Sequence, residues 1–206
     1  MPEHNTDNLN TSPVEKKKHP TVKDKNKEIL AYLHDVVYLL AGVLLIFLLL
    51  FRIVTVDGAS MNDTLLDGDY VLLLNNTFCG KPKQGDVVVI SKKSFKDGSP
   101  SIKRVIATEG QEVIIKNGVV TVDGVVLQED YLNPENVKRI KSPLHTVVEE
   151  GHVFCLGDNR DVSLDSSSPL IGQIDCREII GKAIINFLPR SSDGKSFDFS
   201  RFGGIN

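Results

Sequence analysis

The most pronounced hydrophobic pattern in the chain is a single run close to its N-terminus. Sixteen uncharged residues, 36–51, end before Arg52, and counting back to Ile29 gives 23 mostly apolar positions. At a rise of 1.5 Å per residue, 23 helical residues reach about 35 Å, enough to cross a hydrocarbon core of about 30 Å. The part over 44–51 is apolar on every helical face, which suits lipid better than a small protein core. We therefore predict one transmembrane helix over 29–52.

The residues before this run are polar. Residues 1–28 hold six lysines, five acidic residues and three prolines, a composition that predicts a disordered tail. Arg52 is the only basic residue within about 15 positions after the run, so the positive-inside rule places the tail in the cytoplasm and 53–206 outside the cell membrane. A cleaved secretory signal is the alternative, and it would need an unusually long N-terminal region.

From residue 53 on, short runs of β-branched and aliphatic residues alternate with turn signals, which predicts a mainly β domain built on antiparallel sheet. Asn117-Gly118 and Asp123-Gly124 are two-residue hairpin signals and predict a three-stranded meander over 112–127. No helical period persists outside the apolar run. The predicted strands are 69–74, 86–90, 101–106, 112–116, 119–122, 125–127, 145–148, 152–156 and 178–187. The predicted loops surround Pro134, Pro143 and residues 163–169.

Composition narrows the class of protein. A chain of 206 residues and 22.7 kDa suggests one folded domain with an appendage. With 41% apolar and 25% charged residues it is neither wholly disordered nor fibrous, and a net charge of −3 argues against a nucleic-acid partner. Cys79, Cys155 and Cys176 are too few and too scattered for a disulfide scaffold or a CxxC metal site, although Cys79 and Cys155 could pair.

Three segments of the outer domain carry candidate chemistry. Ser60 follows Gly58 in a turn, Lys103 lies in a predicted strand, and the loop 157–167 is dense in short polar side chains. Each has an ordinary interpretation: a turn serine, a solvated lysine on an edge strand, and a polar loop or weak calcium site. A lysine acts as a general base only when neutral, so burial must lower its pKa from about 10.4 toward about 8.

These segments, in this order after an apolar run, resemble bacterial type I signal peptidases of the Gram-positive kind with a single span. The family's boxes are Ser-Met-x-Pro-Thr-Leu, Gly-Asp-[Ile/Val]-Val, Lys-Arg-Val and Gly-Asp-Asn-Arg-x-x-Ser-x-Asp-Ser. Here they read Ser60-Met-Asn-Asp-Thr-Leu65, Gly85-Asp-Val-Val88, Lys103-Arg-Val105 and Gly157-Asp-Asn-Arg-Asp-Val-Ser-Leu-Asp-Ser166. The resemblance covers about residues 30–190 and implies an antiparallel β-sheet catalytic domain of the signal-peptidase type after one N-terminal transmembrane helix.

The resemblance also implies roles for individual residues. Ser60 matches the nucleophile and Lys103 its general base, a pair that needs no histidine, metal or cofactor, and the Ser60 backbone N–H would donate to the oxyanion. Gly58 stands where some members carry a second, serine oxyanion donor. The further matches are Met61 packing under the nucleophile, Ser163 orienting the lysine amine, Asp165 pairing near Arg104, and Asp158 with Arg160 stiffening the loop.

The chain departs from the family pattern at two single positions and in one short stretch. Asp63 replaces the proline of the first box, and the usual Gly-x-Pro-Gly-Asp after the third box reads Ala107-Thr-Glu-Gly-Gln111. Ser167 replaces the arginine that commonly ends the last box. These changes suggest a specialised member of the family.

The resulting hypothesis is a membrane-bound serine endopeptidase that removes N-terminal signal peptides from exported pre-proteins after small residues, the Ala-x-Ala type. Its expected partners are these pre-proteins and the lipid bilayer. The alternative is a related accessory protein that binds rather than cleaves, for example in the assembly of surface filaments such as pili; Asp63 and the altered stretch 107–111 motivate it.

Overall fold

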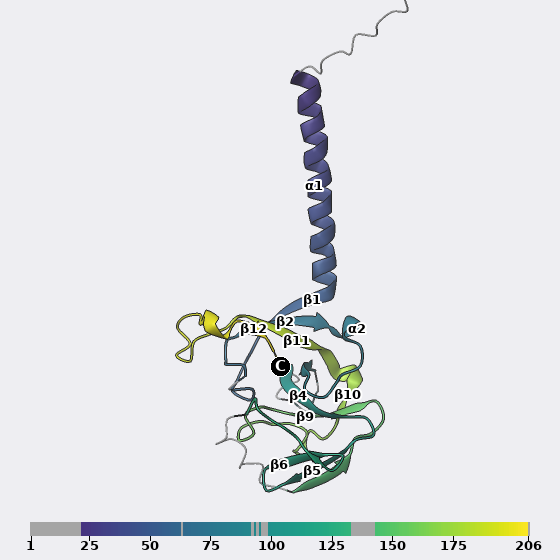
Figure 1. Cartoon of the computed structure of the whole chain (residues 1–206), viewed down its shortest axis with the longest axis vertical. Helices are drawn as coiled ribbons and strands as arrows, with labels where there is room; N and C mark the ends of the chain where they lie inside the picture. The colour runs from purple at the N-terminus through teal and green to yellow at the C-terminus, as the bar shows by residue number, and fades with distance from the viewer. Residues whose placement is uncertain are drawn as a thin grey trace, which may run out of the picture. The chain divides into compact units, whose positions relative to one another are not determined.

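The computed structural model describes residues 22–62, 64–91, 93, 95, 99–132 and 143–205. The chain divides into two units, 1–45 and 46–206. The first contains most of helix α1 (Val22–Leu50), and the second contains all of the described strands (Figure 1).

Helix α1 extends beyond the start predicted from the apolar run. Residues 22–28, expected to be disordered, are helical, because the lysines and the glutamate in this stretch are good helix formers. At the other end, Phe51 and Arg52 belong to strand β1 (Phe51–Thr55) instead of the predicted span. Residues Asn26–Leu50 number 25, and their apolar side chains are exposed, so this helix is long and apolar enough to cross a membrane.

The second unit is mainly β, as predicted. In the part of the chain that the structure describes, all strand pairs are antiparallel and form two sheets. The larger sheet has the order β1-β2-β11-β3-β4-β9-β10, with β12 also paired to β11, and the smaller has the order β7-β6-β5-β8. The strands after β1 are β2 (Tyr70–Asn75), β3 (Val87–Ile90), β4 (Ser101–Thr108), β5 (Glu112–Lys116), β6 (Val119–Val122), β7 (Val125–Val126), β8 (Leu144–Val147), β9 (His152–Leu156), β10 (Ile174–Asp175), β11 (Ile179–Leu188) and β12 (Gly203–Gly204).

The meander predicted over 112–127 is confirmed as β5, β6 and β7. Its two turns are left-handed, with φ of 54° at Asn117 and 49° at Asp123, each followed by a glycine with positive φ. This conformation is that of the two-residue hairpin turns that Asn-Gly and Asp-Gly favour. The predicted loop at 163–169 also contains no strand, whereas the one around Pro134 lies outside the described residues.

Short elements complete the domain and were not predicted. They are strands β10 and β12, helix α2 (Asn76–Cys79), and 3-10 turns at Cys176–Glu178 and Phe199–Arg201. None is long enough to show a hydrophobic period, so pattern alone does not reveal them.

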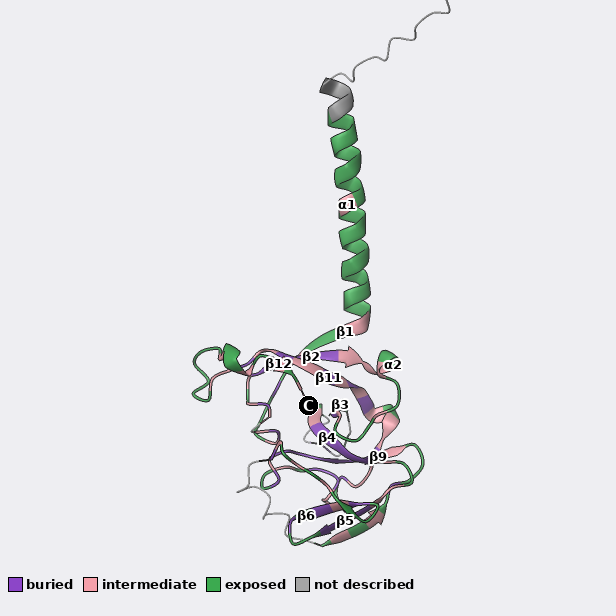
Figure 2. Cartoon of the chain, in the orientation of Figure 1, coloured by how far each residue is buried: buried purple, intermediate pink, exposed green. Residues whose placement is uncertain are grey.

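The core lies around the central strands β3, β4 and β9 (Figure 2). β3 is buried along its whole length, and β4 is buried from Lys103 to Ala107, including its two adjacent cations. Because successive strand residues point to opposite faces, Lys103 and Arg104 leave β4 on opposite sides. One strand therefore serves two different polar clusters.

Candidate active site

Ser60 lies in the turn-rich connection between β1 and β2, and hydrogen bonds hold this connection in place. Its carbonyl accepts a 3.0 Å hydrogen bond from the Asn159 backbone N–H, which ties it to the loop after β9. Gly58, two residues earlier, has φ of 93°, a conformation open mainly to glycine. The N–H of Gly58 donates to Asp67 at 2.8 Å. Met61, next to Ser60, is buried in the cluster that packs under β2 and β3.

The Lys103 amine faces Ser60. Its Nζ donates to Ser60 Oγ at 2.8 Å, to Ser101 Oγ at 2.8 Å and to the Ile102 carbonyl at 2.9 Å. The Phe95 ring centroid lies 5.9 Å away. Only 2% of Lys103 is exposed, so its amine lies in a desolvated environment that disfavours the charged form.

Burial lowers the pKa of Lys103 to about 8. Nearby negative charge on Asp165 and, to a smaller extent, on Asp158 raises the pKa and opposes part of this effect. The net result is an amine whose neutral form is well populated at mildly alkaline pH. A neutral amine within hydrogen-bonding distance of a serine hydroxyl can remove its proton.

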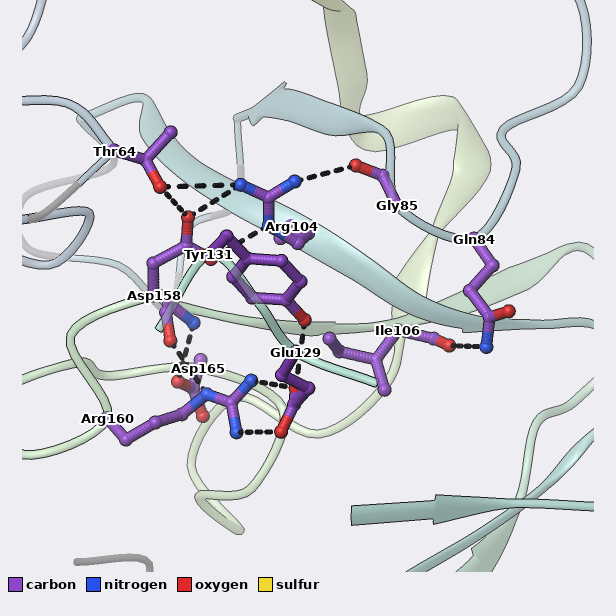
Figure 3. A network of polar contacts seen from close by, with 11 residues as sticks. Thr64, Gln84, Gly85, Arg104, Ile106, Glu129, Tyr131, Asp158, Arg160 and Asp165 are labelled. Carbon is purple, nitrogen blue, oxygen red and sulfur yellow. Dashed lines mark hydrogen bonds and ion pairs between the residues drawn. The ribbon is translucent and has the colours of Figure 1, made fainter. Parts of the chain in front are cut away.

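Arg104, on the other face of β4, is held by a buried polar network (Figure 3). Its Nε and Nη2 donate to the two carboxylate oxygens of Asp158 at 2.9 and 2.7 Å. Thr64 donates to the same carboxylate at 2.5 Å, Gly85 accepts from Nη1 at 3.0 Å, and the Tyr131 ring centroid lies 3.9 Å from Cζ. The network joins the segment after Ser60 to β4 and to the loop after β9.

The role suggested for Asp165 beside Arg104 is wrong. Both oxygens of Asp165 are engaged within its own loop, by the N–H of Gly157 at 3.0 Å and by the N–H and hydroxyl of Ser167 at 3.1 and 2.7 Å. Asp158 is the acid that pairs with Arg104, because it lies two residues after Leu156, the β9 residue that pairs in register with Arg104 of β4. Ser167, one of the departures from the family pattern, helps hold Asp165.

Asp158 and Arg160, which were expected to stiffen the loop together, have different side-chain partners. Arg160 donates through Nε to the Gly157 carbonyl at 3.0 Å and pairs through its terminal nitrogens with Glu129. Glu129 also accepts from the Tyr131 hydroxyl at 2.8 Å. Glu129 and Tyr131 lie outside all four boxes, so the motifs could not reveal them. They contact Arg160 and Arg104 because the segment before residue 133 packs against the loop after β9.

The structure shows no hydrogen bond between the Lys103 amine and Ser163. Its hydroxyl is buried and has no hydrogen-bond partner among the described residues. It packs closely against Gly157, where an added Cβ would come within 2.2 Å of Ser163 Oγ and 2.5 Å of the Ser60 carbonyl oxygen. The serine that meets the amine is Ser101, which sequence reasoning missed although it lies two residues before Lys103, on the same face of the strand.

Two adjoining cavities open beside Ser60. One of about 580 Å³ is lined by Ser60, Lys103 and the apolar side chains of Phe95, Val162 and Leu164. The other, of about 280 Å³, is lined mainly by backbone and apolar side chains, namely Val54, Thr55, Val56, Asp57, Ser60, Met61, Val89, Ser99, Pro100 and Ile102. A larger cavity of about 600 Å³ elsewhere in the domain includes neither Ser60 nor Lys103.

Other candidate chemistry is limited in the described part of the chain. It contains no group of three or more His, Cys, Asp or Glu side chains that could hold a metal ion. Cys79, Cys155 and Cys176 are free thiols, and burial raises the pKa of each. Asp63 lies outside the described residues.

Comparison with known proteins identifies the class of protein. The family model described as "Signal peptidase, peptidase S26" matches residues 29–188. A probable signal peptidase I-1 from Synechocystis is 35% identical over 155 residues, covering 70% of this chain and 75% of that protein. Signal peptidase I of Bacillus licheniformis is 30% identical over 181 residues, covering 81% and 92%.

Two further comparisons involve Gram-positive species. Signal peptidase IB of Staphylococcus aureus is 34% identical over 161 residues, covering 70% of this chain and 81% of that protein. The crystal structure of a signal peptidase I from Enterococcus faecalis shares 28% identity with a TM-score of 0.43, covering 50% of this chain and 96% of that one. The chain belongs to the signal peptidase I family. It is a serine endopeptidase that removes signal peptides.

Proposed function

We propose that this chain cleaves signal peptides from exported pre-proteins with Ser60 as nucleophile and Lys103 as general base. The observation that carries the assignment is the 2.8 Å hydrogen bond between Lys103 Nζ and Ser60 Oγ, made by an amine that is almost fully buried. The lowered pKa of Lys103, about 8, supports a base that is neutral during turnover.

The proposed reaction moves one proton through the amine. Ser60 Oγ attacks the carbonyl carbon before the cleavage site while its proton passes to neutral Lys103, which becomes an ammonium. The ammonium then protonates the leaving nitrogen, the C–N bond breaks, and an acyl-enzyme ester on Ser60 is left with a neutral amine. Water attacks the ester, giving its proton to Lys103, and the proton returns to Ser60 as the acid product leaves.

The oxyanion formed at the tetrahedral stage needs donors placed in advance. The backbone N–H of Ser60 is the proposed donor. Gly58 brings no side-chain hydroxyl, and its own N–H is engaged by Asp67. Residue 58 therefore supplies no second donor, which leaves the backbone, water or no second donor at all.

The smaller cavity, of about 280 Å³, is the proposed site for the substrate side chains before the cut. The family resemblance implies that these side chains are small, the Ala-x-Ala preference. The substrate segment would lie as an extended strand beside residues 54–57, which lead directly to Ser60. Backbone hydrogen bonds would then provide affinity that is independent of sequence.

The charge pattern supports an orientation in the cell membrane with the N-terminus in the cytoplasm and the peptidase domain outside. Lysines precede α1, and Arg52 is the only basic residue shortly after it. A pre-protein held in the same bilayer by its own hydrophobic segment would meet the enzyme at a raised effective concentration.

The binding-only alternative gains little from the described residues. The altered stretch 107–111 forms a closed turn, in which the Gln111 N–H donates to the Thr108 carbonyl at 3.1 Å and Gln111 Oε1 accepts from the Thr108 N–H at 2.9 Å. Its Gly110 has φ of 82°, as a tight turn requires. The divergent sequence therefore builds an ordinary strand connection away from Ser60.

The test is cleavage of an Ala-x-Ala pre-protein by the full-length chain in detergent, with the N-terminus of the product sequenced. Ser60→Ala and Lys103→Met should each abolish correct cleavage, because each removes one end of the proton path. Lys81→Met, on an exposed lysine paired with Glu109, is the matched control and should cleave like the wild type. A folded wild type no faster than Ser60→Ala across several pre-proteins would overturn the assignment in favour of binding.

A further inference from the structure

We propose that Ser101 is the positioning residue that aims the Lys103 amine at Ser60. The family resemblance gives this task to Ser163, but the geometry points to the serine two residues before the lysine. The inference rests on the proposed roles of Ser60 and Lys103 and adds a third residue to them.

Ser101 is well placed for this task by the sheet. It is the first residue of β4 and pairs in register with Ile90 of β3, while Lys103 pairs with Val88. Residues two apart in a strand project from the same face. The Ser101 hydroxyl can therefore reach the end of the lysine side chain, and the Nζ–Oγ distance is 2.8 Å.

The hydrogen-bonding capacity of the amine explains why a second acceptor matters. A neutral lysine amine has two N–H groups and one lone pair, whereas the ammonium has three N–H groups. With Ser101 Oγ and the Ile102 carbonyl at 2.8 and 2.9 Å accepting the two N–H groups, the lone pair is left for the Ser60 hydroxyl. After proton transfer, the third N–H of the ammonium points toward Ser60, so the proton can be given back in a later step.

Without the Ser101 hydroxyl, only the Ile102 carbonyl would fix the amine. The neutral amine could then rotate about its last bond and spend much of its time with an N–H, not the lone pair, directed at Ser60. Proton transfer requires the lone pair, so the rate should fall even though the lysine is still buried.

Ser163 is a poor candidate for the same task. Its buried hydroxyl has no hydrogen-bond partner among the described residues, and its close neighbour is Gly157. It lies in the same loop as Asp158 and Asp165. Its hydroxyl makes no hydrogen bond that its removal would take from the amine.

Among the described residues, the carboxylates of Asp165 and Asp158 raise the pKa of Lys103 by their charge, and Cys155, a thiol whose own pKa is raised by burial, is the other titratable group beside it. Its hydrogen-bond partners within the described residues are neutral: Ser60, Ser101 and the Ile102 carbonyl. An acceptor stabilises an ammonium more than an amine, so loss of the Ser101 hydroxyl should lower the pKa of Lys103 further. This gives the positioning role a signature in the pH profile.

The experiment measures kcat and KM from pH 6 to pH 10 for the full-length chain in detergent, with an Ala-x-Ala peptide as the probe. The deciding pair is Ser101→Thr and Ser101→Val, which match in shape and strand preference and differ by one hydroxyl. Ser101→Ala, Ser163→Ala and Ser91→Ala, an exposed serine after β3, complete the set. Circular dichroism checks that each variant is folded.

We expect kcat of Ser101→Val and Ser101→Ala to fall about tenfold, which corresponds to the loss of one hydrogen bond, with KM little changed. The acidic limb of the kcat profile, where the rate falls as Lys103 is protonated, should move to lower pH. Ser101→Thr should restore both the rate and the limb. Ser163→Ala should leave the limb where it is in the wild type, and Ser91→Ala should match the wild type throughout.

Equal rates and limbs for Ser101→Thr and Ser101→Val would overturn the inference, as would a shifted limb in Ser163→Ala alone. If Ser60→Ala and Lys103→Met are inactive while Ser101→Val behaves like Ser101→Thr, the Ser60–Lys103 pair stands and only the role of Ser101 fails. Activity in Ser60→Ala would instead overturn the proposed function itself.

Discussion

Replacing Asp158 with alanine would leave the Arg104 guanidinium charged, buried and without its carboxylate. Both side chains are 1% exposed, and the two hydrogen bonds between them are 2.9 and 2.7 Å long. Arginine stays protonated at any working pH, so the charge cannot be removed by titration. The partners left to it would be Gly85, Thr64 and the Tyr131 ring.

Breaking a buried ion pair from one side costs about 3–5 kcal/mol, since the remaining charge is desolvated and uncompensated. The remaining contacts of Arg104 place Asp158→Ala at the lower end, about 3 kcal/mol of unfolding free energy. Asp158→Asn keeps one acceptor and should cost about half as much. The double variant Arg104→Met/Asp158→Leu removes both charges, and its cost should be well below that of Asp158→Ala.

The assay is urea unfolding of the full-length chain in detergent. The chain has no tryptophan, so circular dichroism in the β-sheet region is the signal. Lys81→Ala serves as the surface control, because the Lys81–Glu109 pair is 88% and 42% exposed and should contribute little to the free energy of unfolding. An Asp158→Ala variant no less stable than Lys81→Ala would refute the reasoning, as would a double variant as unstable as the single one.

Three more predictions follow from the geometry. The kcat/KM should fall tenfold per pH unit below about 8, because the neutral form of Lys103 is lost as its amine is protonated; a profile flat down to pH 6 would contradict this base. Gly157→Ala should reduce cleavage at least about a hundredfold, since its Cβ would lie 2.5 Å from the Ser60 carbonyl oxygen. Gly203→Ala, with open space around it, should cleave normally, and equal activities of the two variants would show that the loop can move aside. Asn117→Gly should be neutral or stabilising and Asn117→Val destabilising by about 1–2 kcal/mol in urea unfolding, because the turn holds φ at 54°; the reverse order would contradict the left-handed turn.

The sequence was sufficient for features that depend on neighbouring residues. The apolar run, the Asn117 and Asp123 hairpins and most strand positions follow from local period and turn chemistry, and the structure places them as predicted within a few residues. The four boxes, read in order, were sufficient for the family. Ser60 and Lys103 could be nominated in the same way, because each lies inside a box.

Partner choice among the buried polar groups could not be predicted. Asp158, Asp165, Arg104 and Arg160 were all nominated, but Asp165 was expected beside Arg104, whereas Asp158 is the acid that pairs with it. Arg104 takes an acid 54 positions away, and Arg160 takes Glu129, 31 positions away and outside every box. These pairs depend on which charges reach the same buried point once the sheet and loop are packed together.

The same distinction applies to the proposed catalytic centre. The sequence by itself determined that a serine near the apolar helix and a strand lysine belong to one family pattern. Only the tertiary structure decided that the lysine is buried enough for its pKa to fall to about 8, and that Ser101 rather than Ser163 shares its amine. Strand period and turn type are set by adjacent residues, whereas desolvation and hydrogen-bond geometry are set by everything that surrounds a side chain after folding.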